Sequence, residues 1–206
     1  MDCKRSVGVV LFHEFELLDV FGPLEMHGLL PKHFEIHLIA ENRGQVQSAQ
    51  GSKSVAEKAF TDEDQYNILL VPGGRGTRSQ VKNSVLLDWL KRQSTSAEYV
   101  TSVCTGSVLL ARAGLLDNIR ATTNKMAFEW VSAQGPSVIW EKQARWVEDG
   151  KFFTSSGVSA GMDMLLALIA KLYGQKIAEQ VATWAAYEWH QHSTWDPFAK
   201  LHGLVH

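Results

Sequence analysis

Short apolar runs alternate with longer segments of helical periodicity along most of this chain. The runs at 6–12, 66–71 and 99–103 are short and continuous, which is typical of strands buried on both faces of a sheet. The run at 34–40 alternates more loosely and is interpreted as another strand. Helices are expected at 18–30, 81–93, 105–113, 127–134, 161–173 and 175–189. This alternation predicts an α/β sandwich with a mostly parallel sheet and helices on both faces.

Two stretches depart from this alternation. Asp149-Gly150 stands between extended runs at 144–147 and 151–154, and this strong turn signal predicts a small β-hairpin added to the sheet. The polar stretch at 41–53 is interpreted as a loop, with a short hairpin as the alternative.

Length and composition agree with one globular domain. The chain has 206 residues, of which 45% are apolar, and this share excludes a disordered protein. The chain shows no internal repeat and becomes irregular after about residue 190. We therefore expect a single domain over residues 1–206, with a core at about 5–190 and an irregular C-terminal tail.

The charges nearly cancel, because 20 Lys and Arg face 22 Asp and Glu and give a formal net charge of −2. A near-neutral chain has no general attraction for the phosphate backbone, so we expect no nucleic-acid partner. The first apolar run is shorter than a signal-peptide core, and no run approaches the roughly 20 residues of a membrane span. These features predict a cytoplasmic protein with no membrane partner and favour a small, weakly charged substrate.

The two cysteines, Cys3 and Cys104, are too few and too far apart for a disulfide framework or a thiolate metal site. His190 and His192 do not share one helix face, and no acidic or cysteine cluster accompanies them. We therefore expect no metal and no cofactor.

Cys104 stands where an apolar strand runs directly into a predicted helix. This is the pattern of a nucleophile elbow, in which a sharp turn exposes one side chain above the sheet. A helix N-terminus would favour the thiolate, and the N–H of Thr105 could stabilise an oxyanion. The competing interpretation is a buried, inert cysteine.

Two further features follow buried strands. Gly73 and Gly74, after Pro72, could form an anion nest or half of an oxyanion hole, although no P-loop pattern follows them. Asp19 is an acid in an apolar neighbourhood and could orient or exchange protons with a reacting group. A helix N-cap is the competing interpretation of Asp19.

Gly157-Val158-Ser159-Ala160-Gly161 matches the serine-hydrolase pattern G-x-S-x-G. Asp196 and His202 follow in the chain order that such enzymes use, so a serine hydrolase is a real alternative. The chain is short for that fold, and the partners would come from a polar tail. The competing interpretation is a helix entry of small residues that packs closely on the sheet.

Taken together, these motifs resemble the ThiJ/PfpI superfamily, and most of all its branch of isonitrile hydratases and AraC-type sensor domains. The resemblance spans about residues 5–190 and implies a flavodoxin-like three-layer sandwich of the class that also contains glutamine amidotransferases. It rests on an ordered set: Asp19-x-x-Gly22-Pro23-x-Glu25, Pro72-Gly73-Gly74, Val103-Cys104-Thr105-Gly106, Arg120-Ala121-Thr122-Thr123 and Ser156-Gly157-Val158-Ser159-Ala160-Gly161-Met162-Asp163.

The resemblance implies roles for single residues. Cys104 would be the nucleophile, Asp19 the acid beside its sulfur, and Thr105 the adjacent residue used in isonitrile hydration. Gly73, Gly74 and Thr105 would supply backbone N–H groups. Ser159 would lie near the site without being a nucleophile.

The chain also departs from the family pattern. The protease-like branch has His where Thr105 stands, so a peptidase dyad is not expected. Many relatives have His where Asn124 stands, which leaves His13 as a candidate pocket histidine.

The leading hypothesis is a small-molecule hydratase or hydrolase that uses the Cys104 thiolate with help from Asp19. The alternatives are a redox or ligand sensor based on Cys104 and a serine hydrolase based on Ser159. Family members are commonly dimers, so a homodimer is expected.

Overall fold

A central seven-stranded sheet organises the chain in the computed structural model, which describes residues 4–206. Its strand order is β10-β11-β7-β6-β1-β2-β5, and Cys3 lies outside the described residues. The strands of this sheet are β1 (Arg5–Val10), β2 (Phe34–Ala40), β5 (Lys58–Ala59), β6 (Ile68–Val71), β7 (Tyr99–Val103), β10 (Trp146–Asp149) and β11 (Phe152–Ser155).

All neighbouring strands of the sheet run parallel except β10, which pairs antiparallel with β11. Strand β1 lies between β2 on one side and β6 on the other, so the chain leaves β1 and β6 in opposite directions. In open α/β sheets ligands bind outside the carboxyl ends of the strands at such a switch point. The loops after β1, β6 and β7 are therefore the place to look for a site.

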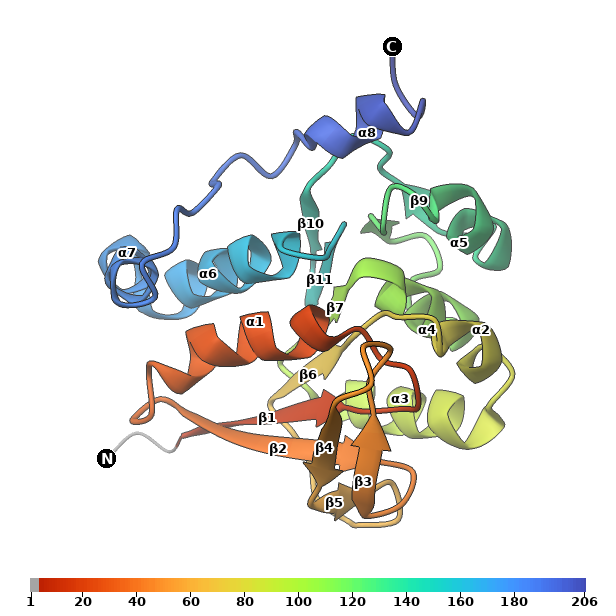
Figure 1. Cartoon of the computed structure of the whole chain (residues 1–206), viewed down its shortest axis with the longest axis vertical. Coiled ribbons are helices and arrows are strands. Elements are labelled where there is room, and N and C mark those ends of the chain that lie inside the picture. The colour runs from red at the N-terminus through yellow and green to blue at the C-terminus, as the bar shows by residue number, and fades with distance from the viewer. Residues whose placement is uncertain (1–3) are drawn as a thin grey trace.

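Helices cover both faces of the sheet (Figure 1). Helices α1 (Leu17–Gly28), α6 (Ala160–Tyr173) and α7 (Gln175–Trp184) pack together on one face. The other face carries α2 (Thr77–Gln80), α3 (Ser84–Ser96), α4 (Ser107–Arg112) and α5 (Phe128–Gln134). All four residues of β6 are fully buried, as expected for a strand covered on both faces. This arrangement confirms the predicted α/β sandwich with its mostly parallel sheet.

Small elements surround the main sheet. A hairpin of β3 (Gly44–Gln47) and β4 (Lys53–Ala56) falls largely within the polar stretch for which a short hairpin was the alternative. Strands β8 (Arg120–Ala121) and β9 (Ile139–Trp140) pair with each other. Like β5, these last two strands have only two residues each and carry no pattern that a sequence could reveal.

The C-terminal region corrects two expectations. The helix predicted at 175–189 ends at Trp184, because Ala186 adopts a left-handed φ of 49° and the next residues bind elsewhere. The tail, predicted to be irregular, contains a short helix, α8 (Pro197–Leu201), which is capped by the Asp196 carboxylate. No helix among residues 4–206 is both long and apolar enough to cross a membrane.

Candidate active site

Cys104 lies directly after β7, where a single 3₁₀ turn leads into α4. Its φ of 57° falls in the left-handed region, which is uncommon for residues other than glycine and marks local backbone strain. Two hydroxyls, of Thr123 at 3.0 Å and Ser107 at 3.4 Å, donate to the Cys104 carbonyl. The geometry is that of the elbow predicted from the sequence. The side chain itself is buried, with an exposed fraction of 7%.

Asp19 approaches this corner from α1 on one face of the sheet. Its Oδ2 accepts a hydrogen bond of 2.8 Å from the N–H of Gly73, which follows β6. Its Oδ1 is buried with no hydrogen-bond partner among residues 4–206, and the Cys104 thiol is near enough to lower the pKa of this carboxyl. Asp19 lies in the first turn of α1, after the N-cap residue Glu16, so the interpretation as an N-cap is wrong.

Burial controls the electrostatics of the pair. It raises the pKa of the Cys104 thiol well above its usual range, and the Asp19 carboxylate raises it further, while the N–H and hydroxyl of Thr105 lower it. Burial likewise raises the pKa of Asp19 well above its usual range, against the lowering effect of the Gly73 N–H. The expected favouring of the thiolate by a helix N-terminus is therefore outweighed by desolvation in this structure.

The glycine turn after β6 is closed around Thr105. The Gly74 N–H donates to the Thr105 hydroxyl at 3.1 Å, and the Thr77 hydroxyl donates to the same oxygen at 3.2 Å. A Cβ at Gly73 would lie 2.5 Å from the Thr105 nitrogen. Since the N–H groups of Gly73 and Gly74 are both engaged, they are not the free oxyanion donors that the sequence suggested. The Thr105 N–H, which acts on the Cys104 sulfur, remains a candidate donor.

The G-x-S-x-G segment forms a wall of the Cys104 site. A Cβ at Gly157 would collide with the Cys104 Cβ, and one at Gly161 would lie 2.8 Å from a Val103 methyl group. These glycines let the start of α6 approach β7 closely, which is the packing interpretation of the motif. Ser159 accepts a 3.5 Å hydrogen bond from Arg145.

The structure does not assemble a serine triad. Asp196 accepts a hydrogen bond from Ser156 and caps α8, whereas His202 is exposed. In the described part of the chain no histidine hydrogen-bonds to Ser159.

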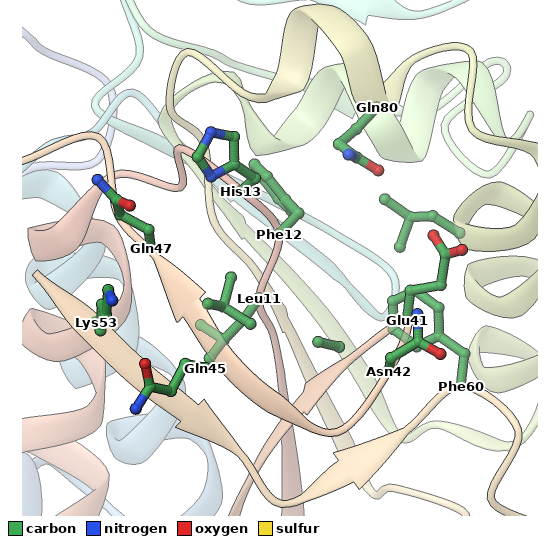
Figure 2. Close-up of a pocket in the computed structure, with 13 residues that line it drawn as sticks. Leu11, Phe12, His13, Glu41, Asn42, Gln45, Gln47, Lys53, Phe60 and Gln80 are labelled. Carbon is green, nitrogen blue, oxygen red and sulfur yellow. The ribbon is translucent and has the colours of Figure 1, made fainter. Parts of the chain in front are cut away.

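The remaining predicted pocket residues, Asn124 and His13, make no hydrogen bond to Cys104 in the described part of the chain. The Asn124 amide oxygen accepts from the Ala127 N–H at 3.1 Å and so caps a turn. His13 lines a separate pocket beside the β3–β4 hairpin (Figure 2). Neither His13 nor any other histidine within residues 4–206 hydrogen-bonds to Cys104 or Asp19.

Sequence reasoning missed a buried polar layer behind the elbow. The Lys125 ammonium donates to the Thr122 hydroxyl at 2.7 Å and to the Ala144 carbonyl at 2.6 Å. Burial lowers the pKa of Lys125 to about 8. Next to it, Arg145 forms a buried ion pair of 2.6 Å with Asp163. Thr122 and Asp163 belong to motifs of the sequence, but no spacing pattern points to Lys125 or Arg145, and only their burial reveals them.

Within this layer, Asp163 accepts hydrogen bonds from the segment that follows α7. Asp163 Oδ1 accepts from the Tyr187 hydroxyl at 3.0 Å and from the His190 N–H at 2.9 Å. The Asp163 carbonyl accepts from the Trp189 indole at 3.2 Å. These bonds explain why the chain leaves the helical path before Trp189.

Comparison with known proteins gives consistent matches. The sequence profile of the DJ-1/PfpI family matches residues 5–171. The isonitrile hydratase of Pseudomonas putida is 34% identical over 176 residues, which cover 85% of this chain and 75% of that protein. The crystal structure of a ThiJ/PfpI family protein from Pseudomonas syringae superimposes with a TM-score of 0.83 at 29% identity, covering 90% of this chain and 76% of that one.

A regulator also matches over most of the chain. The HTH-type transcriptional regulator GbdR of Pseudomonas aeruginosa is 26% identical over 189 residues, which cover 89% of this chain. The chain spans about half the length of that regulator, 51%.

Proposed function

Because this chain belongs to the DJ-1/PfpI family, and because its elbow pairs a buried cysteine with a buried carboxyl, we propose that it hydrates isonitriles to formamides through Cys104 and Asp19. The similarity to isonitrile hydratase at 34% identity supports the reaction class. The observation that carries the proposal is the Cys104–Asp19 pair itself, with no histidine hydrogen-bonded to it within residues 4–206.

The pair retains a proton at neutral pH. Burial raises the pKa of both acids, and the thiolate and the carboxylate disfavour each other when they lie so close together. Two coupled acids of this kind titrate as a unit, and we propose that a proton of the pair is shared between sulfur and carboxyl. Hydration of an isonitrile requires one nucleophile and one proton donor that act on the same carbon. The pair supplies both, because the sulfur is the nucleophile and the shared proton is the one donated.

The reaction then needs two balanced steps. In the first, the Cys104 sulfur forms a bond to the terminal isonitrile carbon while the shared proton moves from the Asp19 carboxyl to that carbon, which gives a thioimidate. In the second, water adds to the thioimidate carbon, with Asp19 accepting a proton from the water, and the C–S bond breaks. The leaving sulfur and the nitrogen take up protons, the product is a formamide, and the pair is restored.

Neighbouring residues position this chemistry. The Thr105 N–H and hydroxyl stabilise negative charge on the sulfur, and Gly157 allows the start of α6 to close over it. The Gly73 N–H holds the carboxyl toward the sulfur from the β6 side. Gly73 therefore acts as a positioning residue for Asp19.

The test is formamide production from tert-butyl isonitrile, followed by NMR. Cys104→Ser and Asp19→Asn should each reduce turnover to the uncatalysed rate, because each removes one half of the pair. The Asp19→Asn variant keeps a side-chain oxygen that can accept from the Gly73 N–H, so it should remain folded. Ser159→Ala should retain turnover, since among residues 4–206 the Ser159 hydroxyl hydrogen-bonds only to Arg145.

Two results would reject the proposal. Full turnover by Cys104→Ser would show that the sulfur is not the nucleophile. A wild-type protein that converts no isonitrile, yet gains two oxygen atoms at Cys104 in mild peroxide, would instead favour a sensor, a role consistent with the regulators among its relatives.

The proposal includes a homodimer. Leu18 and Phe21 are 41% exposed on α1, on either side of Asp19 in the sequence. An exposed apolar pair next to a site is typical of a surface that a partner covers. Light scattering should give twice the 23.0 kDa mass of one chain, and a mass of 23.0 kDa at all concentrations would contradict a dimer.

A further inference from the structure

A second pocket opens at the carboxyl ends of β1 and β2, beside the β3–β4 hairpin (Figure 2). We call it the hairpin pocket. Its volume is about 440 Å³, within the range of small-molecule sites. Cys104, Asp19 and Thr105 do not line it, so it is distinct from the candidate active site.

The floor of the hairpin pocket is apolar and buried. It consists of side chains at the end of β2 or just after β1 and β5, together with one from α3: Leu11, Phe12, Ala40, Phe60 and Leu86. These five side chains are at most 6% exposed. A ligand with an aliphatic body would bury it against this floor.

The rim carries opposite charges on opposite sides. Figure 2 shows Lys53 with Gln45 and Gln47 on the hairpin side, and Glu41 across the pocket, with Leu11 between them. The Glu41 Oε2 accepts from the Asn83 amide at 2.9 Å, which orients this carboxylate.

The hairpin side of the rim is not committed to other contacts. Within residues 4–206, the Lys53 ammonium and the side chains of Gln45 and Gln47 have no hydrogen-bond or ion-pair partner in the protein. A cation is thus available on one side of an apolar floor and an oriented anion on the other.

We propose that the hairpin pocket binds a small zwitterion whose ammonium and carboxylate groups are separated by an aliphatic chain. The ligand carboxylate would face Lys53, the ammonium would face Glu41, and the chain would lie on the floor. The amides of Gln45 and Gln47 would complete the hydrogen bonds of the carboxylate.

The test uses isothermal titration calorimetry with 6-aminohexanoate on the full chain. We expect saturable binding with a dissociation constant below about 1 mM. Hexanoate and hexylamine carry one charge each, and norleucine carries both charges at one end. Each of these should bind at least about tenfold more weakly, because it satisfies only one side of the rim.

Variants assign the binding to this pocket. Lys53→Met and Glu41→Gln should each weaken 6-aminohexanoate binding by at least about tenfold. Lys32→Met and Glu57→Gln, which change the same residue types at positions outside the pocket, should bind as the wild type does. Cys104→Ser should also bind normally, which separates this proposal from the proposed function.

Three results would overturn the proposal. One is the absence of saturable heat up to about 10 mM 6-aminohexanoate. Another is equal affinity for hexanoate, hexylamine or norleucine, which would contradict two separated charges. The third is unchanged affinity in both pocket variants.

Discussion

The Cys104 site and the hairpin pocket lie at the same end of one sheet but are built in opposite ways. Around Cys104, glycines allow contacts too close for any side chain, and the polar groups of Asp19 and Thr105 are buried. Around the hairpin pocket, the floor is buried, but the side chains of Gln47 and Lys53 are exposed and have no hydrogen-bond or ion-pair partner within residues 4–206. The polar groups of the Cys104 site already make contacts within the protein, whereas those of the hairpin pocket are open to solvent or a ligand.

This difference has a physical consequence for how each region responds to change. A buried polar group depends on its partners and cannot be altered without leaving one of them unsatisfied. An exposed side chain exchanges its protein environment for water at little cost. Substitutions should therefore be costly around Cys104 and mild around the hairpin pocket.

The largest effect is expected at Gly157. Gly157→Ala places a methyl group against the Cys104 Cβ and adds a side chain at a φ of 67°, so it should lower the free energy of unfolding by about 3 kcal/mol. Isonitrile turnover should fall by about 100-fold, because the sulfur is displaced.

Gly150→Ala is the matched control for Gly157→Ala. Gly150 has a similar φ of 58°, but a Cβ there would meet nothing within 4 Å. Denaturant titration should show a loss of about 1 kcal/mol for this variant, with normal turnover. Equal losses in the two variants would mean that backbone strain, not the contact with Cys104, sets the cost.

Lys125 should make stability depend on pH. Burial depresses its folded-state pKa to about 8 from 10.5, so the stability that it contributes is present above pH 10.5 and is lost as pH falls through 8. The unfolding free energy of the wild type, relative to Lys125→Met, should therefore rise by about 2–3 kcal/mol over this interval. Lys53→Met, which changes an exposed lysine, is the control. If the unfolding free energy of the wild type rose equally relative to Lys53→Met, the pH dependence could not be assigned to Lys125.

A smaller effect is expected from Asp19→Asn on the reactivity of Cys104. Burial raises the pKa of the thiol and the Asp19 carboxylate raises it further, so removal of this charge should lower that pKa and speed iodoacetamide alkylation severalfold at pH 8. The alkylation rate across pH is the measurement. Glu16→Gln should act in the same direction and more weakly, since Glu16 raises the thiol pKa less. Slower alkylation of both variants would contradict the coupling.

The smallest effect is expected in the hairpin pocket. Gln47→Ala removes an exposed side chain that has no hydrogen-bond partner in the part of the chain that the structure describes, so the unfolding free energy should change by less than about 0.5 kcal/mol. Thermal or denaturant unfolding measures this directly. A loss comparable to that of Gly157→Ala would erase the contrast between the two regions.

Much of the fold follows from local patterns, because buried strands and amphipathic helices carry their periodicity in the sequence. The elbow at Cys104 was predictable for the same reason: an apolar strand there runs directly into a helix. The end of α7 was not, since it depends on a left-handed Ala186 and on the distant Asp163. Tertiary partners decided that boundary.

The candidate site was predictable in its residues but not in its electrostatics. Motifs brought Cys104, Asp19 and Thr105 together, but they suggested a lowered pKa for the Cys104 thiol, whereas burial raises it. The free N–H groups expected at Gly73 and Gly74 are engaged, because the carboxylate and hydroxyl that use them come from other parts of the chain. Burial and long-range bonding do not show in a local motif.

The hydrogen bond from Gly73 to Asp19 joins residues 54 positions apart, and the thiol that completes the site follows a third strand. Chain segments so distant meet only after the central strands have aligned. No fragment that ends before β7 can contain the reactive corner. Recovery of activity after dilution from denaturant therefore reports that the sheet has assembled, and a partly refolded chain should show no activity.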